Sequence, residues 1–78
     1  MHGYLDMWIV YDHPTDFPTM YVARRQEIRA IDNGGTRVTG DILHSTRLKD
    51  IRRDLYDRGF TCIQRHEQDD PKIIEVWI

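Results

Sequence analysis

The segment that most constrains the fold is 45–59, STRLKDIRRDLYDRG, because it alone in this 78-residue chain has helical periodicity. Leu48, Ile51 and Leu55 are spaced i, i+3 and i+7, which predicts one apolar stripe on a helix over residues 46–58. The other segments have the patterns of strands and turns. A helix with a single apolar stripe must bury it, so the sequence predicts one helix packed on a sheet.

Residues at both ends of this segment are typical of helix termini. Ser45 or Thr46 can accept a hydrogen bond from the first free backbone N–H groups of the helix. Gly59 can adopt the left-handed conformation that ends a helix. These residues support the predicted bounds.

Five apolar or alternating runs predict strands around the helix. Three precede it and two follow it, over residues 7–11, 20–31, 36–43, 60–66 and 72–78. The short connections favour antiparallel pairing. We therefore expect an α+β fold in one domain, residues 1–78, with a mainly antiparallel sheet of about five strands and the order βββαββ. One helix can cover only one face of such a sheet.

Three details of the strands are also predicted. The first six residues have no clear pattern, so we expect an extension that is poorly ordered, and Met7 is an alternative initiator. Alternation over residues 20–31 changes parity near Arg24 to Glu27, which predicts a bulge there. Gly40 is expected to interrupt the third strand.

Composition and charge exclude several classes of protein. The net charge is −2, with acidic ends and a mildly basic middle, which argues against wrapping nucleic acid by bulk electrostatics. A lone Cys62 cannot form an internal disulfide, and the Cys/His spacing of a structural zinc site is absent. There is no apolar run of about 18 residues. We therefore expect a cytoplasmic protein with no membrane partner.

The segment 12–18, DHPTDFP, offers the densest group of chemically active residues. Asp12, His13 and Asp16 lie within five residues and could bind a metal, but aspartates also cap turns, and the turn interpretation is favoured. Each proline is expected to hold its predecessor, His13 or Phe17, in an extended conformation. The segment is thus predicted to be a rigid loop.

No constellation predicts catalysis. Cys62 and His66 are about 13 Å apart along an extended strand, at 3.3 Å per residue, so they cannot act as a pair, and Cys62 is interpreted as a buried strand residue. The G-x-S-x-G, P-loop and H-E-x-x-H motifs are absent. We expect no enzyme, no cofactor and no metal site.

Basic residues raise two hypotheses. The helix carries four candidate nucleic-acid contacts, namely Arg47, Lys49, Arg52 and Arg53. Acidic residues one helical turn away can neutralise much of this charge, as in Asp54 with Arg58 and Arg53 with Asp57. Arg24 and Arg25 are adjacent, so they point to opposite faces of a strand. One of the two is expected to contact the acidic loop at residues 12–16.

The sheet face that the helix leaves open is the most informative surface. If Trp77, Tyr21 or Tyr11 lies there, an aromatic association patch results. The full candidate interaction surface comprises Tyr11, Asp12, His13, Asp16, Tyr21, Arg24, Arg25 and Trp77. Homodimerisation through this face or a strand edge is compatible with every hypothesis.

The run MWIVYDHPTDFPTMYVARR and the terminal DDPKIIEVWI carry a resemblance. In these motifs the chain resembles small bacterial and prophage-type proteins with a YDHPxDFP, YVAR and DDP pattern, a group with no established activity. The resemblance implies an accessory protein or an anti-CRISPR-like inhibitor of a host defence system. Our first hypothesis is a non-enzymatic protein-interaction module of bacterial or phage origin, and the alternative is a nucleic-acid-binding accessory protein.

Overall fold

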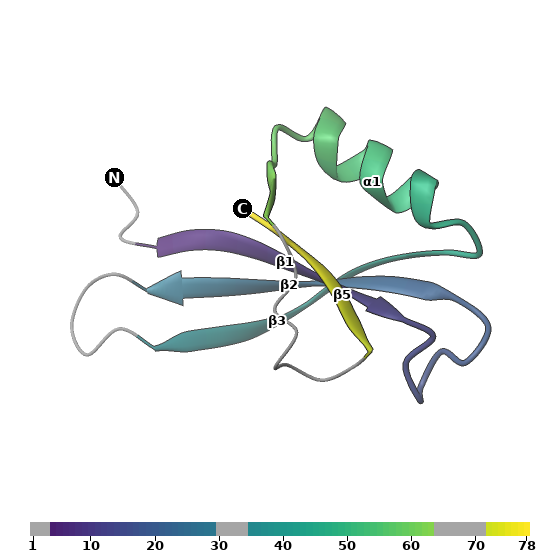
Figure 1. The fold of residues 1–78 in the computed structure, drawn as a ribbon. Coiled ribbons are helices and arrows are strands. Elements are labelled where there is room, and N and C mark those ends of the chain that lie inside the picture. Colours follow the sequence, from purple (N-terminus) through teal and green to yellow (C-terminus); the bar gives the residue numbers. More distant parts are fainter. Residues whose placement is uncertain (1–3, 30–34, 64–71) are drawn as a thin grey trace.

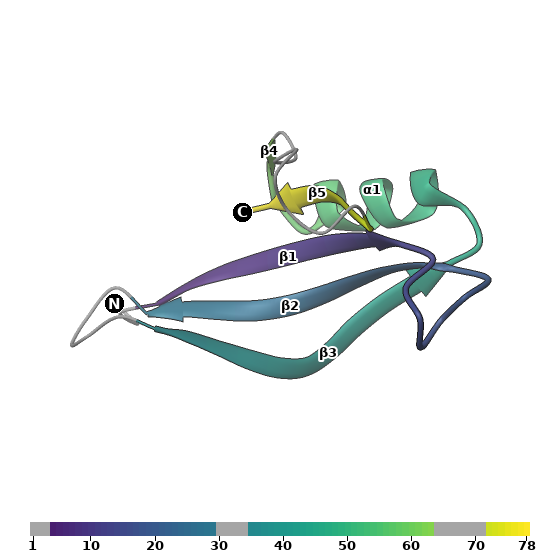
Figure 2. The ribbon, with the colours of Figure 1, turned by 60° about the horizontal axis from the view of Figure 1, so that its bottom comes forward.

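The structure is a computed structural model that describes residues 4–29, 35–63 and 72–78. Its elements, in chain order, are β1 (Tyr4–Asp12), β2 (Tyr21–Arg29), β3 (Thr36–Ser45), α1 (Leu48–Asp57), β4 (Cys62–Ile63) and β5 (Ile73–Trp77). All strands pair antiparallel in one sheet with the order β3-β2-β1-β5-β4, and α1 lies on one face of it (Figures 1 and 2). The predicted α+β fold and the order βββαββ are confirmed.

The core lies between α1 and the middle of the sheet. Ile51 and Leu55 are at most 2 % exposed, as the apolar stripe predicts. They pack against side chains from three strands, namely Trp8, Val10, Ala23 and Trp77. Burying one such aliphatic side chain contributes about 1.5–3 kcal/mol, so this contact positions the helix.

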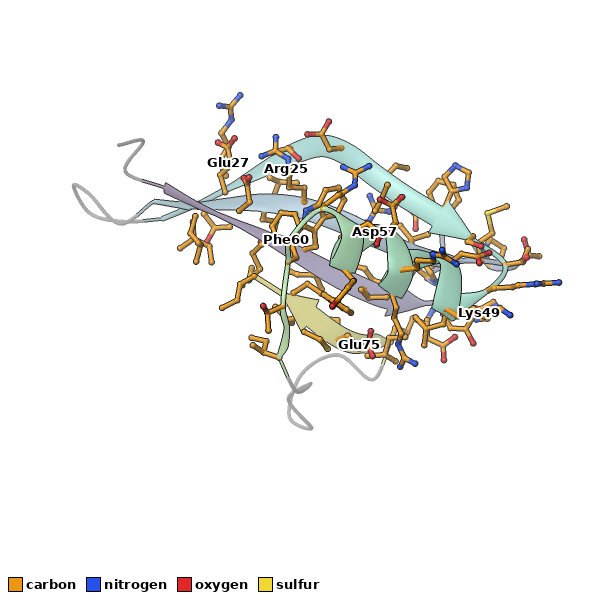
Figure 3. All side chains as sticks on the ribbon, turned by 90° about the horizontal axis from the view of Figure 1, so that it is seen from above. Arg25, Glu27, Lys49, Asp57, Phe60 and Glu75 are labelled. Carbon is orange, nitrogen blue, oxygen red and sulfur yellow. The ribbon has the colours of Figure 1, made fainter. Side chains whose placement is uncertain are left out.

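The helix covers only part of the sheet. Beyond it, β1, β2 and β3 continue as a three-stranded extension, which we call the wing and define as residues 4–7, 25–29 and 36–41 (Figures 2 and 3). Residues 4–6 belong to β1, which corrects the expectation of a poorly ordered extension there. Residues 1–3 lie outside the described residues.

Strand β2 is regular, contrary to prediction. Its register with β1 is unbroken from Asp12↔Tyr21 to Tyr4↔Arg29, so it does not change face near Arg24 to Glu27. The irregularity lies in β3, where residues 39–41 stand opposite Arg25 alone. Thr39 Oγ1 donates to the Arg25 carbonyl at 2.8 Å and holds this bulge, which includes Gly40. The third strand is thus interrupted where Gly40 predicts.

The predicted helix spans 46–58, whereas α1 begins two residues later, at Leu48, and ends one residue earlier, at Asp57. Arg47 is the N-cap and makes no side-chain cap, whereas Ser45 Oγ accepts from the Arg47 N–H at 3.1 Å. At the other end Gly59 has φ +93°, and its N–H donates to the Tyr56 carbonyl at 3.0 Å. The Phe60 N–H donates to the Leu55 carbonyl at 3.1 Å, which completes a Schellman motif.

Replacing Gly59 with alanine tests this helix end. No heavy atom lies within 4 Å of an added Cβ, so the cost comes from the left-handed backbone alone. We expect Gly59→Ala to lower the free energy of unfolding by about 1–2 kcal/mol. Urea denaturation followed by circular dichroism measures it. The matched control is Gly40→Ala, which also has open space but no positive φ; equal losses in the two variants would contradict this account.

Candidate interaction surface

The sheet face opposite α1 is nearly free of charge. Strand register places these side chains on it: Leu5, Met7, Ile9, Tyr11, Val22, Arg24, Gln26, Ile28, Thr36, Val38, Ile42, His44, Ile63 and Val76. We call this set the open face, because no helix or strand among the described residues lies over it, although Val22 and Val76 within it are buried. Arg24 is its one charged residue. Leu5 is 50 % exposed and Val38 is 70 % exposed, so the wing presents apolar side chains to solvent.

The loop between β1 and β2 borders this face. Its base is closed by the His13 N–H, which donates to the Met20 carbonyl at 3.0 Å, and Pro14 is buried. Asp16 forms an ion pair with Arg24, as the sequence predicts for one of the two adjacent arginines. Phe17 stacks on the imidazole of His44 with ring centroids 6.0 Å apart. The loop is therefore anchored to β2 and β3.

His13 differs from the prediction. Its φ of +49° is left-handed and not extended, although Pro14 follows it. The imidazole Nδ1 contacts the Asp12 carboxylate, and the ring packs edge-on against Tyr21 at 4.9 Å between centroids. These contacts and the backbone hydrogen bond to Met20 hold the residue in a conformation that the following proline disfavours.

The structure divides the predicted surface residues between two faces. Tyr11 and Arg24 lie together on the open face, with the arginine Cζ 5.9 Å from the tyrosine ring centroid. Trp77 is only 6 % exposed and faces α1, so its proposed place in a surface patch is corrected. Tyr21 packs against the same core, because its register position opposite Asp12 points to the helix side.

Arg25 lies on the opposite face of the wing and organises a cluster of charges (Figure 3). Its guanidinium donates to Asp41 and Asp6 at 2.7 Å each, and to Glu27 at 3.2 Å. The hydrogen bonds that Arg25 donates, to Asp41 first and then to Asp6, raise its pKa above the ordinary value. Arg25 therefore forms its ion pairs within the chain. These charges all lie on the helix side of the wing, whereas the open face carries little charge.

The residues considered for metal binding or catalysis do not converge. Asp12 contacts His13, but Asp16 turns to Arg24. Among residues 4–29, 35–63 and 72–78, no group of three His, Cys, Asp or Glu side chains is close enough to hold a metal ion. Cys62 is exposed, which corrects the prediction of a buried strand residue, because β4 pairs on one side only with β5. Partial burial and the charge of Glu75 raise the pKa of its thiol.

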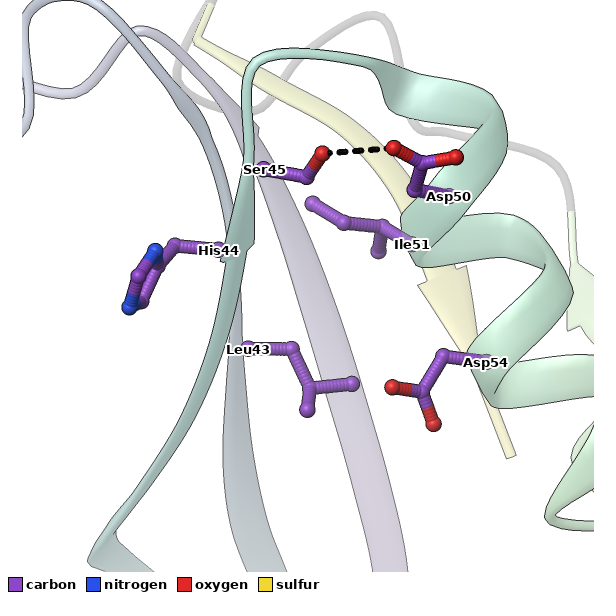
Figure 4. Close-up of a pocket in the computed structure, with 6 residues that line it drawn as sticks. All are labelled: Leu43, His44, Ser45, Asp50, Ile51 and Asp54. Carbon is purple, nitrogen blue, oxygen red and sulfur yellow. Dashed lines mark hydrogen bonds between the residues drawn. The ribbon is translucent and has the colours of Figure 1, made fainter.

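A small hollow lies between the end of β3 and the first turns of α1 (Figure 4). Its volume is about 190 Å³, and it is lined by Leu43, His44, Ser45, Asp50, Ile51 and Asp54. Asp50 already accepts a hydrogen bond from Ser45 Oγ at 2.9 Å, and Asp54 accepts from Arg58 at 2.6 Å. Both carboxylates are thus engaged within the chain.

Half of the predicted nucleic-acid contacts are paired with carboxylates. Arg52 bonds Glu75 at 2.6 Å, which raises the pKa of its guanidinium, and Arg53 approaches Asp57 to 4.0 Å. Arg47 and Lys49 have no ion pair within the described part of the chain. Nucleic-acid binding through the helix stays a prediction that depends mainly on these two residues.

The apolar part of the open face is the feature that the predicted residue set missed. Met7, Ile9, Ile28 and Ile42 line its centre, each partly exposed. The signal was present in the alternation of β1, where Leu5, Met7, Ile9 and Tyr11 share one parity. Because both sides of β1 carry apolar side chains, its alternation predicts a second apolar face on the sheet.

No helix among the described residues is long and apolar enough to cross a membrane. Comparisons with protein-family models, with curated proteins and with solved structures find no match in any of the three. The function therefore has to be inferred from the chemistry of the surface itself.

The ion pair between Asp16 and Arg24 generates a prediction about the loop. Asp16 is 56 % exposed, so Asp16→Ala should lower global stability by less than about 1 kcal/mol. Hydrogen exchange at the His13 amide should nevertheless accelerate, because the loop loses one of its anchors. Thr19→Ala, an exposed change in the same loop, is the control and should leave that amide unaffected. Unchanged exchange in Asp16→Ala would show that the pair does not anchor the loop.

Proposed function

We propose that this protein is a small non-enzymatic interaction module that binds a protein partner on its open face. One observation carries the proposal: on the sheet face that has no helix over it, the wing exposes the apolar side chains Leu5 and Val38. Exposed apolar area of this kind is costly in water and commonly marks an association surface.

The charges on this surface suit protein binding. Burying an unpaired charge in an interface is costly, but Arg24 already has Asp16 as its partner and lies over Tyr11. A partner can therefore cover the open face without leaving Arg24 uncompensated. The anchored loop supplies a polar rim next to an apolar centre, which is the usual anatomy of a protein interface.

The biological setting rests on the resemblance. The motifs DHPTDFP and YVAR suggest a protein of bacterial or phage origin, and the finer proposal is an inhibitor of a host defence system of the anti-CRISPR kind. Such an inhibitor acts by occupying a surface of its target, which requires binding and no chemistry. The open face would be the binding surface.

The test is a pull-down from bacterial lysate with the tagged full chain, with and without nuclease, identified by mass spectrometry. We expect one stoichiometric protein that survives nuclease. The double variant Leu5→Glu/Val38→Glu should reduce its capture by about tenfold or more, because it places charge in an apolar interface. Both residues are exposed, so the fold should persist.

The control is Tyr56→Glu, which adds one negative charge, against two in the double variant, at a 73 % exposed residue on α1. Capture should be unchanged in this variant. Equal capture by the wild type and the double variant would remove the open face as the binding surface. Partners that vanish with nuclease would favour the nucleic-acid alternative, with Arg47 and Lys49 as its contacts.

A further inference from the structure

We infer that the outer edge of β3 and the hollow beside α1 together bind an extended segment of a protein partner. The segment pairs with β3 as an added strand and carries a lysine or arginine between two apolar residues. Its basic side chain enters the hollow lined by Asp50 and Asp54 (Figure 4). The inference goes beyond the proposed function, because this site lies at the sheet edge and on its helix side, away from Leu5 and Val38.

The first observation is a row of outward-pointing backbone groups on β3. The His13 N–H donates to the Met20 carbonyl, and the direction of bonding alternates along an antiparallel strand. Even-numbered residues of β2 therefore bond to β1, and odd-numbered ones bond to β3. Ile42 and His44 stand opposite even-numbered residues of β2, so their N–H and C=O groups point away from β2. Because β3 lies at one end of the sheet, no described strand pairs with them.

This edge is short, which selects a short linear segment. The bulge at residues 39–41 leaves residues 42–45 as the regular stretch. Four residues span about 13 Å at 3.3 Å per residue, and an added antiparallel strand gains about four backbone hydrogen bonds there. Only an extended backbone can satisfy a row of strand groups in this way, so the edge selects a strand over a helix.

The second observation is that the hollow adjoins the same edge. Leu43 lies between the two outward-facing residues, and its side chain points into the hollow, with Ile51 of α1 on the other side (Figure 4). The residue of an added strand that stands opposite Leu43 points to the same face of the sheet. Its side chain is therefore directed towards the hollow, whose volume is about 190 Å³.

The lining of the hollow selects a basic side chain. Leu43 and Ile51 offer an apolar wall to an aliphatic stem, and Asp50 and Asp54 lie one helical turn apart beside it. Within the described residues Asp50 forms no ion pair, and Asp54 bonds Arg58 through Oδ1 only. A carboxylate can accept about four hydrogen bonds, so both can accept further ones from an ammonium or guanidinium group.

The neighbours of the basic residue lie on the open face. Side chains alternate along a strand, so these neighbours stand beside Ile42 and His44. Figure 4 shows the His44 ring pointing away from the hollow, and Phe17 stacks on that ring. An apolar side chain at each of the two positions contacts apolar or aromatic neighbours. A basic residue between two apolar ones therefore matches both faces of the edge.

The test is a titration of the full chain with the capped peptide Ser-Thr-Val-Lys-Val-Thr-Ser, followed by NMR. We expect a dissociation constant of roughly millimolar size, because a short flexible peptide loses much entropy on binding. The amides of Ile42 and His44 should exchange quickly with solvent in the free chain, and about fivefold more slowly with peptide near saturation. Replacing the peptide lysine with glutamate should weaken binding by about tenfold or more, because Asp50 and Asp54 repel it.

Asp54→Asn and its matched control Asp57→Asn test the hollow itself. Each variant removes one carboxylate and one i, i+4 ion pair from α1, but only Asp54 lines the hollow. Asp54→Asn should weaken binding of the lysine peptide by about fivefold and leave a peptide with glutamine in place of lysine unaffected. Asp57→Asn should change binding of either peptide by less than about twofold. Equal losses in the two variants would overturn the inference.

Two further results would also overturn it. One is the absence of chemical-shift changes at Ile42 and His44 with about 10 mM peptide, well above the expected dissociation constant. The other is protection of these amides that grows with the concentration of the chain alone, which would show a second copy on the edge. A wild type that captures a lysate protein but binds no peptide would overturn this inference alone. One that binds the peptide but captures nothing would overturn the proposed function alone.

Discussion

The contact that the rest of the structure depends on is the insertion of Ile51 and Leu55 among Trp8, Val10 and Trp77. These are the side chains that join the helix to β1 and β5, so they determine which face of the sheet becomes the core. The Schellman motif at Gly59 then returns the chain from the helix towards β4. Because ten helical residues cannot cover nine- and ten-residue strands over their full length, the wing is left without a helix.

The wing uses its two faces for different purposes. On the helix side, Arg25 gathers three carboxylates and ties β1, β2 and β3 together with hydrogen bonds. On the other side, apolar residues of the same strands stand in rows with few polar groups. Alternation along the strands separates the two kinds of side chain, and this separation is what makes one face suitable for association.

The fold could be predicted because its signals are local. The i, i+3, i+7 spacing located the helix, Gly59 marked its end, and two adjacent arginines on opposite faces implied the contact with Asp16. The face assignment of Trp77 could not be predicted, because alternation does not reveal which parity meets a helix. The charged residues Arg25 and Glu27 led to the prediction that β2 changes face, because charged side chains are not expected on the face that packs against a helix. A local pattern does not show how far a helix extends over a sheet, so it could not indicate that these residues lie beyond α1.

The bulge at residues 39–41 has a consequence for assembly at high concentration. Edge strands with regular, free hydrogen-bonding groups can recruit further strands without limit and so seed fibrils. Here Thr39 bonds the Arg25 carbonyl and also accepts from the Asp41 N–H, so the outer edge of β3 is interrupted in the middle. An apolar face beside such an irregular edge favours assemblies that close after a fixed number of copies over open-ended polymers.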